Sequence, residues 1–71
     1  MIRKLTGLLH HLVKIEWHYG VLAEWEYYYI RGLDANFVLL EGADAPDGSP
    51  NTDKTPFWAA LRLIDFITQV D

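Results

Sequence analysis

Three histidines, His10, His11 and His18, carry the side chains best suited to chemistry in this sequence of 71 residues. A metal site on a helix needs ligands three or four residues apart, and none of these histidines has a His, Asp or Glu at those offsets. On one helix His11 and His18 would lie about 10 Å apart at 1.5 Å per residue, too far to share an ion within a chain. We therefore expect a solvated polar face and no cofactor, with His11 and His18 as weak metal candidates.

Two copies of the chain meeting at a symmetry axis would remove that obstacle. His11 and His18, or His10, would then face their counterparts in the other copy. A metal-assisted or acid–base enzyme with its site at a dimer interface is therefore the alternative function.

A second possible metal site is the segment 47–53, where oxygen-bearing side chains stand at alternating positions, as in calcium-binding loops. An EF-hand also needs glycine at its sixth position and glutamate at its twelfth. Counted from Asp47, those positions hold Thr52 and Trp58. We predict a turn-rich loop without calcium.

Nucleophilic catalysis has few candidate residues. The sequence has no cysteine, and its only serine, Ser49, lies outside a Gly-x-Ser-x-Gly context. Glu24 and Glu26 supply two carboxylates, but two carboxylates alone do not define a general acid and a general base. We predict no catalytic residue.

Aromatic side chains remain, as anchors for a protein partner. In a helix that continues past Gly20, Trp17, Val21 and Trp25 follow at four-residue steps, and Tyr28 comes three residues later. Such stripes usually pack in a core or a dimer seam, yet Trp and Tyr are also enriched at binding hot spots. The predicted partner-binding residues come from this stripe and from the last helix: Trp17, Val21, Trp25, Tyr28, Trp58, Leu63 and Phe66.

Composition argues against several classes of partner. The net charge is −4 and the six Lys and Arg are scattered, whereas nucleic-acid binding needs a clustered basic face. No apolar run approaches the roughly 20 residues that span a bilayer. The absence of cysteine excludes disulfides and fits a reducing compartment. We expect a cytoplasmic protein that binds neither nucleic acid nor membrane.

The first element that would position these side chains is a helix over about residues 3–19, which continues to residue 31 in its longer form. Apolar residues recur on one face at three- and four-residue steps, and only Val13 and Trp17 break the pattern. The competing interpretation ends the helix at Gly20 and places a β-hairpin over 22–30 and 36–41, because Trp, Tyr and Ile favour strands. That alternative is an α+β fold of helix, hairpin and helix.

The second element follows a predicted flexible loop over residues 42–55, where nearly all the turn-forming residues lie. Thr55 is a plausible N-cap and Pro56 suits the first position of a helix over 56–70. Two apolar stripes would cover neighbouring sides of this helix, leaving four positions for solvent: Trp58, Arg62, Asp65 and Gln69. One small domain cannot easily bury both stripes, so the second predicts a protein partner.

These patterns together predict a single small domain over residues 1–71, mostly α-helical and expected to be a homodimer. Its function would be protein binding, either to itself or to a foreign target. It would act as an adaptor, regulator or inhibitor by steric occlusion, in the style of small inhibitors from phages and mobile elements.

Overall fold

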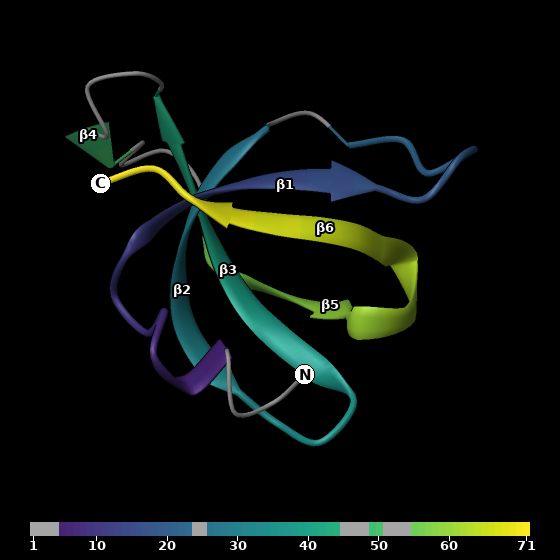
Figure 1. Cartoon of the computed structure of the whole chain (residues 1–71), viewed down its shortest axis with the longest axis horizontal. Coiled ribbons are helices and arrows are strands. Elements are labelled where there is room, and N and C mark those ends of the chain that lie inside the picture. Colours follow the sequence, from purple (N-terminus) through teal and green to yellow (C-terminus); the bar gives the residue numbers. More distant parts are fainter. Residues whose placement is uncertain (1–4, 24–25, 45–48, 51–54) are drawn as a thin grey trace.

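The chain forms one curled antiparallel sheet, seen in a computed structural model that describes residues 5–23, 26–44, 49–50 and 55–71 (Figure 1). Along the chain the elements are β1 (Leu12–Trp17), β2 (Tyr27–Leu33), β3 (Phe37–Asp44), β4 (Ser49–Pro50), β5 (Phe57–Ala60), the 3₁₀ helix η1 (Leu61–Leu63) and β6 (Ile64–Gln69). The strand order is β4-β3-β2-β1-β6, and β5 pairs with β3.

The curl of the sheet follows from its connections. β6 pairs with β1, and β5 pairs with β3, so the two strands lie at opposite sides of the β1–β2–β3 meander. Only the three residues of η1 join them. A link this short brings the two sides of the sheet together, and Figure 1 shows β1 with β6 running across the direction of β2 and β3.

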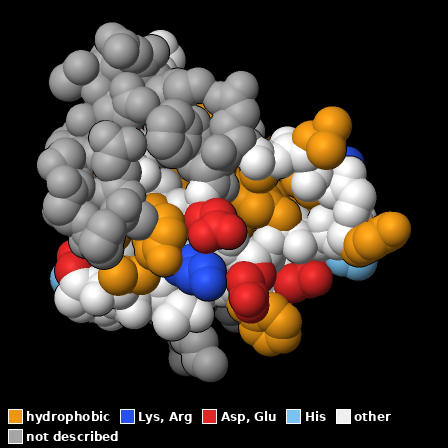
Figure 2. All heavy atoms as spheres, turned by 90° about the horizontal axis from the view of Figure 1, so that it is seen from above, with side chains coloured by type: hydrophobic (Ala, Val, Ile, Leu, Met, Phe, Trp, Pro, Cys, Tyr) orange, Lys and Arg blue, Asp and Glu red, His pale blue; other side chains and the backbone are white. Residues whose placement is uncertain are grey.

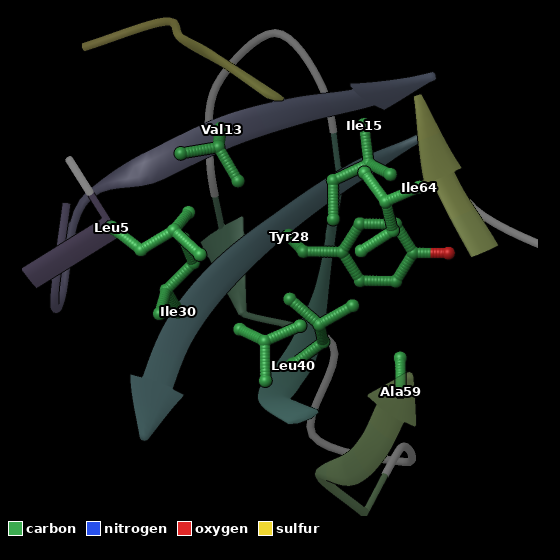
Figure 3. Close-up of a cluster of buried hydrophobic side chains, with 9 residues drawn as sticks. Leu5, Val13, Ile15, Tyr28, Ile30, Leu40, Ala59 and Ile64 are labelled. Carbon is green, nitrogen blue, oxygen red and sulfur yellow. The ribbon is translucent and has the colours of Figure 1, made fainter. Parts of the chain in front are cut away.

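The core fills the inside of the curl, because the side chains of a strand alternate between its two faces. Val13 and Ile15 of β1 point inward beside Tyr28 and Ile30 of β2, while Lys14 and Glu16 point outward. Figure 3 shows these inward side chains meeting those of the other strands and of the N-terminal turn. The buried cluster is Leu5, Val13, Ile15, Tyr28, Ile30, Val38, Leu40, Ala59 and Ile64.

The predicted mostly α-helical fold is wrong, and the described part of its helix over 3–19 consists of an N-terminal turn followed by the strand β1. Leu5 begins a tight turn in which the Leu8 N–H donates to the Leu5 carbonyl, and β1 starts at Leu12. Between them His10 has a φ of 65°, which no right-handed helix contains. Val13 and Trp17, the two residues that broke the helical period, lie on the inward side of β1 with Ile15.

The second predicted helix, over 56–70, is also wrong. This segment forms β5, η1 and β6 instead. Its aromatic and β-branched residues suit a pleated, half-buried surface, and the two stripes that suggested a two-sided helix are divided between two separate strands. Together with β1, this removes both long helices and the dimer seam they were expected to form.

The alternative α+β interpretation was wrong in both of its helices as well, although its hairpin segments overlap β2 and β3. These two strands are paired, with Ile30 opposite Leu40 and Leu33 opposite Val38. In the predicted loop over 42–55, β3 extends to Asp44 and β4 covers Ser49–Pro50. Its positions 45–48 and 51–54 lie outside the described residues.

None of the helices in the described ranges has the length and apolar character needed to span a lipid bilayer.

Candidate apolar binding groove

A hollow of about 400 Å³ opens between the loop that follows β1 and the segment from β5 to η1. None of the described residues that line it carries a charge. They are Trp17, Val21, Leu22, Ala23, Tyr28, Gly42, Thr55, Phe57, Trp58, Ala59, Ala60 and Leu63. We call this hollow and its lining the apolar groove.

Three strands supply the floor of the apolar groove. Trp17 ends β1 at a bulge, where the pairing of β1 with β6 shifts so that Trp17 lies opposite Ile64. Such a bulge turns the local side chains, and it coincides with the position that lines the groove. On the neighbouring strands Tyr28 lies opposite Gly42 across the ladder. Figure 3 shows the Tyr28 ring pointing away from Ile30 and toward Ala59 and Ile64.

The aromatic rings of the floor contact one another edge to face. The Trp17 and Tyr28 ring centroids lie 5.9 Å apart with an interplanar angle of 80°. The Tyr28 and Phe57 centroids lie 6.0 Å apart at 76°. This is the favoured geometry for aromatic pairs, and it fixes three residues that are distant in sequence.

One polar atom in this apolar lining has no partner. The Trp17 indole nitrogen Nε1 is buried, and no hydrogen-bond acceptor within the described residues reaches it. A buried donor left unpaired costs about 1–3 kcal/mol. Among the described residues, this indole N–H is therefore left unsatisfied.

The rim of the apolar groove extends well beyond the hollow as exposed apolar side chains. Leu22 is 100% exposed, Trp58 55% and Phe57 42%. Tyr19, in the same loop as Leu22, is 96% exposed. On the face drawn in Figure 2, hydrophobic side chains form separate patches rather than one continuous covering. The rim is thus a local concentration of apolar surface.

The structure gathers five of the seven predicted partner-binding residues at the groove: Trp17, Val21, Tyr28, Trp58 and Leu63. Phe66 lies elsewhere, on the outer face of β6 opposite Glu16, and is 65% exposed. Trp25 lies outside the described residues. The grouping does not arise from the helical stripe that suggested it, because Trp17 and Tyr28 belong to two adjacent strands.

Several groove residues escaped the sequence prediction. Leu22 and Ala23 were assigned to an extended helix and Phe57 to a core stripe, although all three line the groove. The available signal for the loop was Gly20, whose φ of 90° suits glycine and ends the straight course of the chain after β1.

The histidines are kept apart by the sheet. His11 Nδ1 lies 3.1 Å from Asp71 Oδ1, and His18 Nδ1 lies 3.1 Å from Asp65 Oδ1. These pairs sit at opposite ends of the β1–β6 ladder. Within the described part of the chain no three His, Asp, Glu or Cys side chains converge as metal ligands would.

Asp71 also holds the beginning of β1. Its Oδ2 accepts a hydrogen bond from the Leu12 N–H at 3.1 Å. That bond lowers the pKa of the Asp71 carboxyl below its ordinary value of 3.8, against the opposing effect of desolvation, and His11 and Gln69 lower it further. The role of this carboxylate is structural.

His10 belongs to a third polar cluster, on the outer face of the sheet. Arg31 Nε donates to Glu41 Oε2 at 2.6 Å, and the Arg31 guanidinium carbon lies 4.7 Å from the Tyr29 ring centroid. His10 Nδ1 is 3.2 Å from the guanidinium. With its guanidinium shared among these neighbours, Arg31 is engaged within the protein and does not form a free basic site.

Comparison of the chain with protein-family models, with curated proteins and with solved structures finds no match, so the candidate site rests on its geometry.

Proposed function

We propose that this protein is a small protein-binding module whose apolar groove receives an apolar side chain of a partner protein. It would act as an adaptor, regulator or inhibitor, by covering the partner segment that it holds. The observation that carries the proposal is the groove itself: an uncharged hollow of about 400 Å³ lined by Tyr28, whose ring contacts those of Trp17 and Phe57 edge to face.

The exposed rim favours a protein over a small molecule as the occupant. A small apolar molecule would fill the hollow but leave the fully exposed Leu22 and the half-exposed Trp58 in water. A polypeptide laid along the groove would cover both. Aromatic anchors in a pocket ringed by apolar contacts are typical of binding hot spots in protein interfaces.

The lining of the groove also bears on the chemistry of the partner. The required ligand is an uncharged apolar segment. The absence of charge in the lining disfavours a charged one.

Such a module would work in the cytoplasm. The absence of cysteine supports this, and the net charge of −4 disfavours nucleic acid as the partner. The opposed positions of His11 and His18 give no added support to the alternative of a metal-assisted or acid–base enzyme.

A peptide-library selection against the full chain tests the proposal. Selected peptides should be apolar, and by NMR they should shift the Trp17 indole N–H resonance. Leu22→Glu should weaken their binding at least tenfold, because it places a charge at the apolar rim. Phe66→Glu is the matched control: it charges another exposed apolar position, outside the groove, and should leave binding unchanged.

Two results would count against this function. One is the selection of peptides whose affinity is the same for the native chain and for Leu22→Glu. The other is a groove that takes up small apolar molecules while no peptide is selected at all.

A further inference from the structure

One edge of β5 borders the apolar groove. All four residues of β5, from Phe57 to Ala60, line the hollow. Side chains of a strand alternate between the two faces of its sheet, so a hollow on one face alone would contact every second residue. The hollow therefore runs along the main chain of β5. It lies on the side away from β3, which among the described strands is the only one that pairs with β5.

The pairing with β3 determines which main-chain groups point to this edge. The Leu61 N–H donates to the Asn36 carbonyl at 2.9 Å. The same register continues through β5 without a shift, and it pairs Ala60 with Phe37. Because hydrogen-bonding direction alternates along an antiparallel strand, the main chains of Ala60 and Trp58 point away from β3. Neither N–H has an acceptor among the described residues.

We infer that the partner segment binds as an extended strand along this edge of β5, with its main chain hydrogen-bonded to Trp58 and Ala60. The inference rests on the proposed function, and it adds the conformation and the residue pattern of the segment that the apolar groove holds. Strand addition to a sheet edge is a recurring mode of peptide recognition. Main-chain hydrogen bonds then give affinity, and alternate side chains give specificity.

The chemistry of the edge favours an extended peptide as the occupant. The groups that point to the groove are uncharged amide donors and carbonyl acceptors, and no described lining residue carries a charge. An extended peptide offers the same two groups along its whole length, whereas a helix uses them within itself. A charged ligand would meet no opposite charge in the lining. The complement of this edge is therefore an uncharged strand.

The face of β5 that carries Ala59 determines the side-chain pattern of the partner. Ala59 is buried, and Figure 3 shows its side chain directed from β5 toward the buried cluster. Adjacent residues of neighbouring strands place their side chains on the same face, in parallel and antiparallel pairs alike. The partner residue beside Ala59 therefore turns its side chain toward Tyr28 and into the hollow. Its two neighbours turn outward, so the segment alternates, with an apolar residue at the inward position.

Two uncharged peptide libraries of equal composition, selected against the full chain, test this pattern. One library alternates apolar residues with Ser or Thr. The other spaces the apolar residues three and four positions apart, as on one face of a helix. The alternating library should supply the tightest peptides, with dissociation constants about tenfold lower than those from the helical library.

A proline variant tests the main-chain hydrogen bonds with the tightest of these peptides. Ala60 has a φ of −70°, which suits proline, and its N–H lies outside the ladder with β3. Ala60→Pro should therefore fold, as thermal unfolding checks, and bind the peptide about three- to tenfold more weakly, the effect of one hydrogen bond. Ala60→Val is the matched control, because it adds bulk but keeps the N–H. It should bind as the native chain does.

Hydrogen exchange of single amides in the native chain gives a second readout. Bound peptide should slow exchange of the Trp58 and Ala60 N–H groups about tenfold or more. The Leu61 N–H, already bonded to Asn36, should change little.

Three results would overturn the inference: tighter binding by the helical library, equal affinities of Ala60→Pro and Ala60→Val, or unchanged exchange at Trp58 and Ala60 under bound peptide. The proposed function stands in each case as long as Leu22→Glu weakens the binding. Both fail together only when neither library supplies a peptide.

Discussion

Trp17 and Tyr28 meet edge to face, with their ring centroids 5.9 Å apart, at the point where β1 ends and β2 begins. Eleven positions separate them in the sequence, and the antiparallel pairing of the two strands brings them together. Phe57 adds a third ring from β5. The core and the candidate binding surface are therefore continuous: Tyr28 is buried and also lines the apolar groove.

Replacing Trp17 by phenylalanine should separate stability from binding. Trp17→Phe keeps an aromatic ring against Tyr28 but removes the unpaired N–H, whose burial costs about 1–3 kcal/mol. This gain offsets the lost contacts of the larger ring, so we expect the free energy of unfolding to change by less than about 1 kcal/mol. Urea denaturation measures it. Peptide affinity, measured by calorimetry, should fall several-fold because Trp17 lines the apolar groove; unchanged affinity would contradict that placement.

Truncating Leu40 should destabilise the fold severely. Its side chain is fully buried among the inward residues of the sheet. Leu40→Ala removes these contacts and leaves a cavity, at a cost of about 2–5 kcal/mol. Leu22→Ala is the matched control, since Leu22 is fully exposed and should change stability by less than about 0.5 kcal/mol. Similar unfolding midpoints for the two variants would contradict the placement of the core.

Gly20 should resist replacement because of its backbone conformation rather than its surroundings. Its φ is 90°, and nothing lies within 4 Å of a Cβ built there. Gly20→Ala should therefore cost about 1–2 kcal/mol from strain alone. Gly20→Asn should cost less, because Asn tolerates positive φ better. Equal thermal stability of the native chain and Gly20→Ala would show that the turn does not hold this conformation.

Acid should release the contact between Asp71 and β1. Its pKa is lower in the folded state than the ordinary value of 3.8, chiefly through the Leu12 N–H bond. The stabilisation is therefore complete above that ordinary value and is lost as the pH falls through the lower folded pKa. Asp71→Asn should abolish this part of the pH dependence. Unfolding free energies of both proteins, measured from neutral to acid pH, should converge as the pH falls through the lower folded pKa of Asp71.

A constant difference between the two proteins across that range would show that the Asp71 charge contributes nothing. His11→Ala provides a second check, because it removes a smaller contribution to the same pKa shift. It should reduce the acid-dependent loss without eliminating it.

Segment 12–18 shows why the sequence favoured the wrong secondary structure. Leu5, Leu8, Leu12 and Ile15 satisfy a helical period, yet Val13, Ile15 and Trp17 alternate with polar residues as in a strand. Both patterns share Ile15, and local spacing alone does not choose between them. The choice came from pairing with β2 and β6, which gives Val13 and Ile15 a buried side and supplies the main-chain hydrogen bonds.

The sequence by itself determined the materials: an acidic, cysteine-free chain rich in apolar and aromatic side chains, with a turn-rich stretch near 42–55 and aromatic residues suited to contact a partner. The tertiary structure alone decided the positions of these side chains in the fold. Strand pairing is non-local, so the contacts of Tyr28 with Trp17 and Phe57, and the division of 56–70 into β5 and β6, depend on contacts between distant residues. The helical period relates only residues three or four positions apart in the sequence, so it carries no information on contacts between distant residues.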